Sequence, residues 1–380
     1  MIVLDKVKRI GTVLEQPRIE SCDPFFSRFN KSEYVIFPGF CDVHVHFREP
    51  GFSYKETILT GARAGGAAGY TAVCTMPNLN PVPDCLANLR PQLEKIEEAP
   101  IRVLPYGSVT VGEKGKELSD LEGLAPYVIA FSDDGVGVSD EGMMREAMQR
   151  AKPLGKLIAG HCEDMRYESP REREWREIER NIRLADETGC AFHVCHVSTK
   201  ESIDLIREAK KSHVDITCET APHYLLLNRA LLEDDGRFKM NPPIQDTDDQ
   251  GALLEALCDG TVDMIATDHA PHTDEEKSGG FAQSMNGIVG LETAFPVLYS
   301  GLVLEGILNL ESLVSLMSEK PRARFGIPAN GDFAIWDLET LYTIDPAEFH
   351  SMGRSTPFEG WTVQGRCLLT VHNEKTVFER

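Results

Sequence analysis

The chain has 380 residues, and 60 acidic against 39 basic side chains give it a net charge of −21 with histidine counted as neutral, which argues against a surface for nucleic acid or anionic membranes. Hydrophobic residues make up 42% and charged residues 26%, a composition typical of folded chains rather than disordered ones. No apolar run is long enough to predict a membrane span, so we expect a cytoplasmic globular protein.

In chain order, residues 1–35 predict short strands and turns with no helices between them. From residue 36 onward, short apolar runs alternate with longer amphipathic stretches, the rhythm of strand-helix units. Eight strands are predicted, at 36–47, 71–76, 101–109, 127–131, 157–160, 191–197, 213–218 and 262–267. Apolar residues at helical spacing predict helices that include 54–69, 140–154, 171–188, 200–211 and 250–258.

This alternation predicts an α/β fold, a (β/α)8 TIM-like barrel over residues 36–329, whose reactive groups gather at the C-terminal strand ends. A doubly wound sheet is the main alternative, but no Gly-x-Gly-x-x-Gly follows the first strand. The tail predicts short strands at 332–337, 361–363 and 368–371. We expect residues 1–35 and 330–380 to form a small β appendage together.

The strongest chemical signal is G-F-C-D-V-H-V-H-F-R at residues 39–48. Residues two apart on a strand point the same way, so His44 and His46 should project together from the end of the first barrel strand. Two neutral imidazoles held in this way can bind one borderline metal ion such as zinc.

Histidines and carboxylates also stand at the ends of later predicted strands. They occur in F-S-D-D-G at 131–135, G-H-C-E at 160–163, H-V-C-H-V at 193–197 and A-T-D-H-A at 266–270. Burying such a cluster without an ion would be costly, because its polar groups would lose their hydration. The pattern therefore predicts a metal centre.

In these motifs the chain resembles the amidohydrolase superfamily, and more closely the bacterial dihydroorotases that use an aspartate where relatives use a carboxylated lysine. Further motifs that carry the resemblance are K-E-T-I at 55–58, C-T-M-P-N at 74–78, K-M-N-P-P at 239–243 and G-I-V-G-L-E-T at 287–293. The resemblance implies a metal-dependent cyclic amidohydrolase that interconverts N-carbamoyl-L-aspartate and L-dihydroorotate in pyrimidine synthesis.

The resemblance also implies a set of metal ligands, which are His44, His46, Asp134, His161, His196 and Asp268. Asp268 would join the first histidine pair around one ion, Asp134 would bridge, and the remaining histidines would hold a second ion. The expected cofactor is Zn²⁺, as one or two ions per subunit, with another divalent metal as the alternative. Spacing alone leaves Asp133 open beside Asp134 as the bridging ligand.

Chemical roles follow from this cage. Divalent cations lower the pKa of bound water, so that hydroxide is available near neutral pH, and polarise the scissile carbonyl. Asp268 can act as general base during attack and as general acid toward the departing amide nitrogen.

Substrate selection is expected from residues outside the cage. Arg48 lies two residues beyond His46, where its guanidinium can form a forked pair with a carboxylate. By the resemblance, Arg48, Asn78 and His272 would hold the carboxylate of dihydroorotate, and Asn241 would contact its ring. A turn role after Pro77 is the alternative for Asn78.

Other residues are given supporting or packing roles. His193 alternates out of phase with His196 and is expected to face the helical shell. His223 and His269 are candidates for supporting the site. The glycine-containing stretch 273–286 is expected to be a mobile loop that partly orders over substrate.

Two other functions stay open. Hydantoinase-like or allantoinase-like activity is one, although a neutral dihydropyrimidine ring has no carboxylate to pair with Arg48. The other is a catalytically silent scaffold for aspartate transcarbamoylase, which would be expected to have lost metal ligands. The expected partner is a small-molecule substrate. A homodimer and a complex with aspartate transcarbamoylase stay open. No nucleic-acid or membrane partner is expected.

Overall fold

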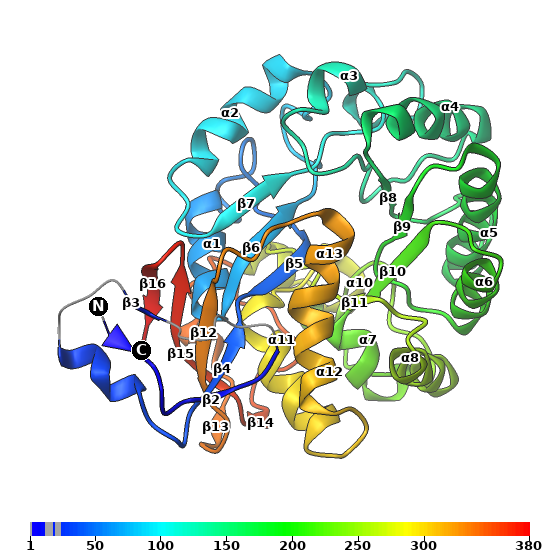
Figure 1. Cartoon of the computed structure of the whole chain (residues 1–380). Coiled ribbons are helices and arrows are strands. Elements are labelled where there is room, and N and C mark those ends of the chain that lie inside the picture. The colour runs from blue at the N-terminus through cyan, green and yellow to red at the C-terminus, as the bar shows by residue number, and fades with distance from the viewer. Residues whose placement is uncertain (1, 12–17, 20–23) are drawn as a thin grey trace.

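The computed structural model describes residues 2–11, 18–19 and 24–380. Parallel strands lie in the middle of this part of the molecule, and helices surround them (Figure 1). Seven of the eight predicted runs overlap such a strand: β5 (Phe40–Val45), β6 (Tyr70–Thr75), β7 (Arg102–Pro105), β8 (Ile158–Gly160), β9 (Phe192–Val194), β10 (Ile216–Thr220) and β11 (Met264–Ile265).

The parallel strands form two sheets, in the orders β5-β6-β7 and β11-β10-β9-β8. Single bridges from Phe131 to Gly107 and to Ile158 connect one side of the two sheets, and a bridge between Val45 and His269 connects the other. The pairing therefore follows the chain order expected of a βα barrel, and closure into a complete eight-stranded barrel stays our proposal.

The predicted strand at 127–131 is wrong as a strand, because only Phe131 has bridge partners. Ile129 N donates to Pro105 O at 2.9 Å on the neighbouring strand. Since Pro105 has no N–H, it cannot return a hydrogen bond, and the ladder is interrupted there. The predicted strand at 213–218 is displaced to β10, and His213 lies in a turn.

The α-helices are α1 (Ile58–Ala67), α2 (Leu86–Ile96), α3 (Leu121–Leu124), α4 (Glu141–Ala151), α5 (Pro170–Thr188), α6 (Lys200–Lys211), α7 (Pro222–Leu226), α8 (Thr247–Asp259), α9 (Asp274–Lys277), α10 (Gly280–Gln283), α11 (Leu291–Leu298), α12 (Leu310–Val314) and α13 (Lys320–Phe325). Helix α6 shows why the prediction worked for the longer helices. Thr199 caps its first turn by accepting from Ser202 N, Ile203 and Ile206 are buried, and lysines occupy its last turn. In the part of the chain that the structure describes, no helix is both long enough and apolar enough to cross a membrane.

A core of small and medium-sized side chains lies inside the ring of parallel strands. Cys41 and Val43 of β5 meet Cys74 of β6 and Cys195 in this core, and Phe325 of α13 packs against it. Alternate residues of the strands therefore fill the interior, which leaves the chain just beyond the C-terminal strand ends to carry the polar site.

The remaining strands form an antiparallel and mixed sheet in the order β16-β15-β12-β4-β2. Its members are β2 (Lys8–Arg9), β4 (Val35–Pro38), β12 (Phe333–Asp337), β15 (Arg366–His372) and β16 (Lys375–Glu379). Strand β1 (Ile2–Val3) pairs with β3 (Arg18–Ile19), and β13 (Tyr342–Thr343) pairs with β14 (Thr362–Val363). Both ends of the chain thus contribute to the same sheet, and its division from the barrel at residues 35 and 330 stays a prediction.

Two expectations about this region were wrong. The predicted strand at 36–47 is two strands, β4 and β5, because the chain passes from one sheet to the other at Gly39. The expectation of no helices within residues 1–35 fails at Pro24–Phe29, which forms a 3-10 helix.

Candidate metal and substrate site

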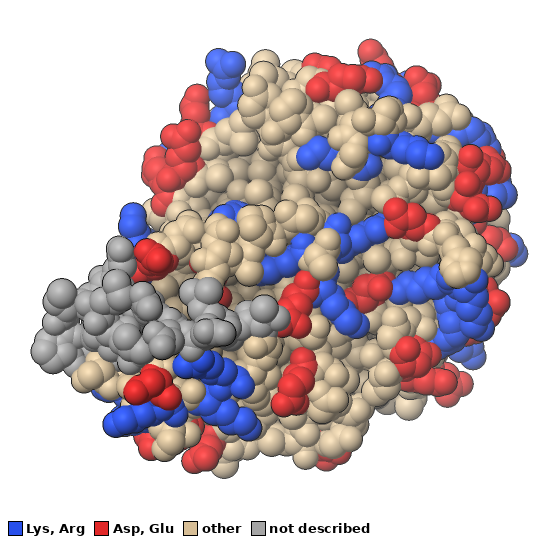
Figure 2. Space-filling view, viewed as in Figure 1, with Lys and Arg blue, Asp and Glu red and all other residues tan. Residues whose placement is uncertain are grey.

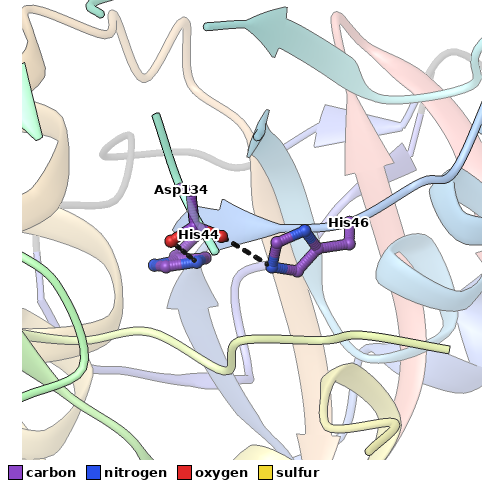
Figure 3. Close-up of side chains that lie close together, drawn as sticks. All are labelled: His44, His46 and Asp134. Carbon is purple, nitrogen blue, oxygen red and sulfur yellow. Dashed lines mark ion pairs between the residues drawn. The ribbon is translucent and has the colours of Figure 1, made fainter. Parts of the chain in front are cut away.

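The first histidine pair extends from the C-terminal end of β5. His44 belongs to the strand and His46 follows its last residue, so both rings project on the same side. Their ring centroids lie 5.3 Å apart, and Figure 3 shows both side chains beside Asp134. His46 N donates to His269 O at 2.8 Å, which ties this strand end to the segment after β11.

Asp134 faces both rings. Its two carboxylate oxygens lie 3.4 Å from His44 Nε2 and 3.4 Å from His46 Nε2 (Figure 3). Asp133 turns away, since its carboxylate accepts hydrogen bonds from the backbone N–H and the hydroxyl of Thr110. Of the two aspartates left open by the sequence, Asp134 is the one beside the imidazoles.

The second histidine pair and Asp268 lie beside the same carboxylate. His161 follows β8, and its Nδ1 lies 3.0 Å from Nε2 of His196, which follows β9. These two atoms are 3.7 and 3.6 Å from Asp134 Oδ1. Asp268, beyond β11, places Oδ1 3.0 Å from His46 Nε2. The six side chains expected to bind metal are therefore brought together.

The donor set fits a divalent cation. His44 Nε2 and Asp134 Oδ1 are buried and have no hydrogen-bond partner among the described residues, which is costly unless another group satisfies them. Two groups of three side chains have their ligand atoms within 4.8 Å of one another: His44, His46 and Asp134, and Asp134, His161 and His196. Imidazole nitrogen and carboxylate oxygen are ligands of zinc and similar divalent metals.

The electrostatics of the cluster also favour a positive charge at its centre. Burial lowers the pKa of His44, but Asp134 and Glu219 outweigh this effect and raise that pKa well above its usual value. Burial raises the pKa of Asp268, but the hydrogen bond from His46 and the charge of His44 hold it below its usual value. The carboxylates therefore stay ionised at neutral pH.

A cavity of about 350 Å³ opens beside this cluster. Every residue predicted to bind metal or substrate lines it, except His44. Arg48 donates from Nε to Pro271 O at 3.3 Å, and its Nη2 lies 3.4 Å from His272 Nε2. The side chains of Arg48 and His272 therefore face the same part of the cavity.

The two predicted asparagines are engaged with histidines of the cluster. Asn78 Oδ1 lies 2.9 Å from His46 Nδ1, so this amide orients the ring as well as lining the cavity. Asn241 Nδ2 donates to Glu163 Oε2 at 2.9 Å and lies 3.4 Å from His161 Nε2. Asn78 is therefore more than a turn residue after Pro77, because its side chain contacts His46 and lines the cavity.

Three of the predicted site residues have positive φ angles, at Arg48 (51°), His196 (34°) and Asp268 (48°). This region is uncommon for residues other than glycine and clusters at functional sites. Each residue follows the end of a parallel strand, and the turn directs its side chain into the cavity.

Sequence reasoning missed Glu219, which lies at the inner end of the site. This residue of β10 is 1% exposed and accepts from His44 Nδ1 at 2.7 Å through Oε1. Its Oε2 lies 3.1 Å from His193 Nε2, and a third group of close ligand atoms consists of His44, Cys195 and Glu219. Burial raises the pKa of Glu219, but both histidines overcome this and lower it to about 2. The sequence offered one signal for Glu219: its carboxylate directly follows the predicted strand at 213–218, as some other site residues follow theirs.

The prediction that His193 faces the helical shell is wrong. Its ring contacts Phe325, a member of the interior core, at a centroid distance of 5.2 Å. Strand alternation does not extend to His196, because the positive φ of that residue turns the chain out of the strand.

Two other histidines take no part in the cluster's ion pairs. His223 is buried, its Nε2 has no hydrogen-bond partner within the described residues, and burial lowers its pKa to about 4. His269 accepts from Gly290 N at 3.2 Å and lies 3.5 Å from Glu56.

The predicted loop at 273–286 contains α9 and α10 and is anchored. Lys277 is buried and donates from Nζ to the carbonyls of Lys239, Met285 and Gly287 at 3.1, 2.7 and 2.6 Å. Capping by Thr273 begins α9. Ordering of this segment by substrate stays a prediction.

Comparison with known proteins places the chain among enzymes. A family model described as "Dihydro-orotase-like" matches residues 33–170. A dihydroorotase of Brevibacillus brevis is 46% identical over 375 residues, with 91% of this chain and 88% of the relative covered. A dihydroorotase of Bacillus cereus is 44% identical over 374 residues, with 91% and 87% covered.

The fold is also found in solved structures. An L-hydantoinase (dihydropyrimidinase) from Arthrobacter aurescens superimposes with a TM-score of 0.80 at 25% identity, covering 91% of this chain and 85% of that one. The identity and coverage of the curated relatives are high enough to decide between these related enzymes: the chain belongs to the dihydroorotase family.

Proposed function

We propose that this protein is a dihydroorotase, which hydrolyses the cyclic amide of L-dihydroorotate to N-carbamoyl-L-aspartate and catalyses the reverse ring closure in pyrimidine synthesis. The observation that carries the proposal is one cavity that is lined by Arg48 and His272 and borders a cluster of four histidines and two aspartates. A metal ion bound by the cluster would promote amide hydrolysis, and the guanidinium of Arg48 would bind an anionic group of the substrate.

We assign the metal to the six ligands named above. A divalent cation held by them supplies a Lewis acid for the scissile carbonyl and lowers the pKa of water. The two groups of close ligand atoms share Asp134, which supports a bridging role for this carboxylate. Zn²⁺, as one or two ions, is the proposed cofactor.

Asp268 is the proposed general base and acid. It is ionised, since the hydrogen bond from His46 and the charge of His44 outweigh burial and keep its pKa below the usual value. It lines the cavity beside the ligand cluster. In this position it accepts a proton from the attacking water and returns it to the departing amide nitrogen.

Arg48 and His272 are the proposed contacts for the substrate carboxylate, with Asn78 next to them and Asn241 on the ring. Burial lowers the pKa of His272 to about 4, and Arg48 adds to that effect. The imidazole is thus neutral at neutral pH and offers one N–H, while Arg48 supplies the positive charge.

The alternatives predict different substrates. A hydantoinase or an allantoinase would act on rings without a carboxylate, so the half-buried guanidinium of Arg48 would have no anionic group of the substrate to pair with. A silent scaffold for aspartate transcarbamoylase would not need the complete ligand cluster. A cytoplasmic location, a homodimer and a complex with that enzyme stay predictions.

The test is a metal analysis of the purified protein together with ultraviolet monitoring of dihydroorotate in both directions. We expect bound divalent metal, turnover of dihydroorotate, and little turnover of hydantoin, dihydrouracil or allantoin. The variant Asp268→Asn is expected to lower kcat by about 10²-fold or more, because the proton acceptor is lost. Preferred turnover of an uncharged ring, or a metal-free and inactive protein, would contradict the proposal.

A further inference from the structure

Two side chains outside the proposed ligand set contact Nδ1 of His272. Lys55, from the segment between β5 and α1, places Nζ 3.2 Å from His272 Nδ1. Glu276, in α9, places Oε2 3.1 Å from the same nitrogen. Lys55 and Glu276 also pair with each other, with 2.8 Å between Nζ and Oε1.

The hydrogen-bond partners fix which nitrogen of His272 carries the proton. Nε2 lies 2.8 Å from Asn286 O, and a carbonyl oxygen can only accept, so Nε2 is the donor. The neutral ring then has an unprotonated Nδ1, which accepts from the Lys55 ammonium because an ammonium can only donate. Glu276 is satisfied instead by Lys55 and by Thr273 N at 3.2 Å.

Without the lysine, the opposite tautomer would be favoured. Glu276 Oε2 can only accept while ionised, and it lies at hydrogen-bond distance from Nδ1. A proton on Nδ1 would give this carboxylate a charge-assisted hydrogen bond, which is stronger than the bond from Nε2 to the neutral carbonyl of Asn286. Nε2 would then be an acceptor. An acceptor repels a substrate carboxylate, whereas a donor binds it.

The cavity side of His272 is arranged for two donors. Arg48 Nη2 lies 3.4 Å from His272 Nε2, and both residues line the cavity. The Nε2–H donates to Asn286 O in this structure, so a substrate carboxylate would share this donor or take the place of that carbonyl. The N–H groups of His272 and Arg48 would then meet the two oxygens of one carboxylate. The Lys55 side chain is 10% exposed and that of His272 is 4% exposed, so water offers Nδ1 little alternative to these partners.

We propose that Lys55 and Glu276 are positioning residues that hold His272 as the Nε2–H tautomer, so that it acts with Arg48 as a paired donor for the substrate carboxylate. This inference rests on the proposed function for the identity of the carboxylate ligand. Lys55 itself acts through His272 and not on the reacting atoms. The ion pair also joins the segment after β5 to α9 across the rim of the cavity.

The first readout needs no catalysis. In holoenzyme labelled with [¹⁵N]histidine, two-bond ¹H–¹⁵N correlation spectra distinguish the two neutral tautomers, and the His272 signals are assigned by their loss in His272→Gln. We expect the Nε2–H pattern in the wild type and the Nδ1–H pattern in Lys55→Met. Lys55→Arg, which keeps a positive donor, should retain the Nε2–H pattern.

The second readout is the division of the effect between KM and kcat. Lys55→Met should raise KM for dihydroorotate by about tenfold or more, as for loss of a hydrogen bond to a charged group, with a smaller change in kcat. Lys55→Arg should recover most of the loss. Lys239→Met is the matched control, because Lys239 Nζ donates to Ala282 O in α10 at 2.6 Å and tethers the same segment without touching His272.

The outcomes separate the two proposals. A wild-type tautomer in Lys55→Met overturns the positioning role, and a raised KM with that unchanged tautomer assigns Lys55 to direct substrate contact instead. An equal effect of Lys239→Met shows that any loosening of the segment suffices and also overturns it. Absence of dihydroorotate turnover in the wild type would contradict the proposed function, while the tautomer measurement would still decide the role of Lys55.

Discussion

Glu219 is a buried carboxylate that contacts His44, a proposed metal ligand, at the ring nitrogen that faces away from Asp134. Its two oxygens lie 2.7 Å from His44 Nδ1 and 3.1 Å from His193 Nε2, inside the ring of strands. A ligating histidine commonly donates its second N–H to such a carboxylate, which fixes the ring and makes the free nitrogen more basic. His44 Nε2, the atom with no partner in the described structure, is thereby directed at Asp134.

We therefore predict that Glu219→Gln weakens metal binding by about 10- to 100-fold. The amide cannot balance the charge of His44 and offers only one oxygen to the two rings. Competition for Zn²⁺ with a chromophoric chelator measures the affinity. Thr217→Val is the matched control, since Thr217 Oγ1 lies 2.9 Å from Nδ1 of His193, the ring nitrogen that faces away from Glu219. Equal affinities in Glu219→Gln and the wild type, with intact circular dichroism, would refute this role.

At the scale of elements, the sequence predicted long amphipathic helices and apolar strands well, because burial periodicity dominates there. The helices at 171–188 and 200–211 agree with α5 and α6 within one residue. Prediction was poorer where the backbone determines the limits of a strand. Pro105 interrupts a hydrogen-bond ladder, and Gly39 divides one predicted strand into two. The site histidines and aspartates could be found from motifs at strand ends. Glu219 had only its place just beyond a predicted strand as a signal, and the roles of Lys55 and Glu276 depend on contacts that their spacing in the sequence does not reveal.

Gly39 marks the passage from β4 to β5, where the two sheets meet. A Cβ built on it would lie 2.2 Å from Thr71 Oγ1. Thr71 Oγ1 in turn accepts from Arg322 Nη2 at 2.7 Å, and the same guanidinium donates to Gly39 O at 3.1 Å. The absence of a side chain at this position lets β5 approach β6 and lets α13 tie down the junction.

We predict that Gly39→Ala lowers the free energy of unfolding by about 1–3 kcal/mol, the usual cost of overpacking. Urea denaturation measures the change. The matched control is Gly251→Ala in α8, where a Cβ would have nothing within 4 Å. That substitution should stabilise the protein by about 0.5–1 kcal/mol, because alanine is the better helix former. A neutral Gly39→Ala would show that the junction can adjust.

On the scale of the whole molecule, residues 350–352 of the C-terminal segment are held by α11 and by a residue just before α1. On the face shown in Figure 2, acidic and basic side chains are intermixed around the edge of the molecule. The C-terminal segment is held by two carboxylates, those of Glu292 and of the buried Glu56. Glu292 of α11 accepts from His350 N and Ser351 N at 2.8 and 3.1 Å, and Glu56, just before α1, accepts from Ser351 and Met352.

The surroundings of the Glu292 carboxyl group should make the free energy of unfolding depend on pH. Burial raises the pKa of Glu292 to about 7, against the two backbone donors that lower it, and Glu56 raises it further. The native carboxyl keeps its proton over a range in which the unfolded chain, with a pKa near 4.5, has lost it. Since the native state binds more protons between these two values, the contribution of Glu292 to stability is present below pH 4.5 and is lost as the pH rises through 7.

We predict that the free energy of unfolding of the wild type, minus that of Glu292→Gln, falls steadily from about pH 5.5 to about pH 7 and is constant above about pH 8, because the amide cannot titrate. Urea denaturation across this range gives the difference directly and cancels all groups common to both proteins. Glu311→Gln, at an exposed position in α12, is the control and should give a difference independent of pH. A difference that rises with pH would mean that Glu292 is ionised in the native protein, and that His350 and Ser351 bind it as an anion.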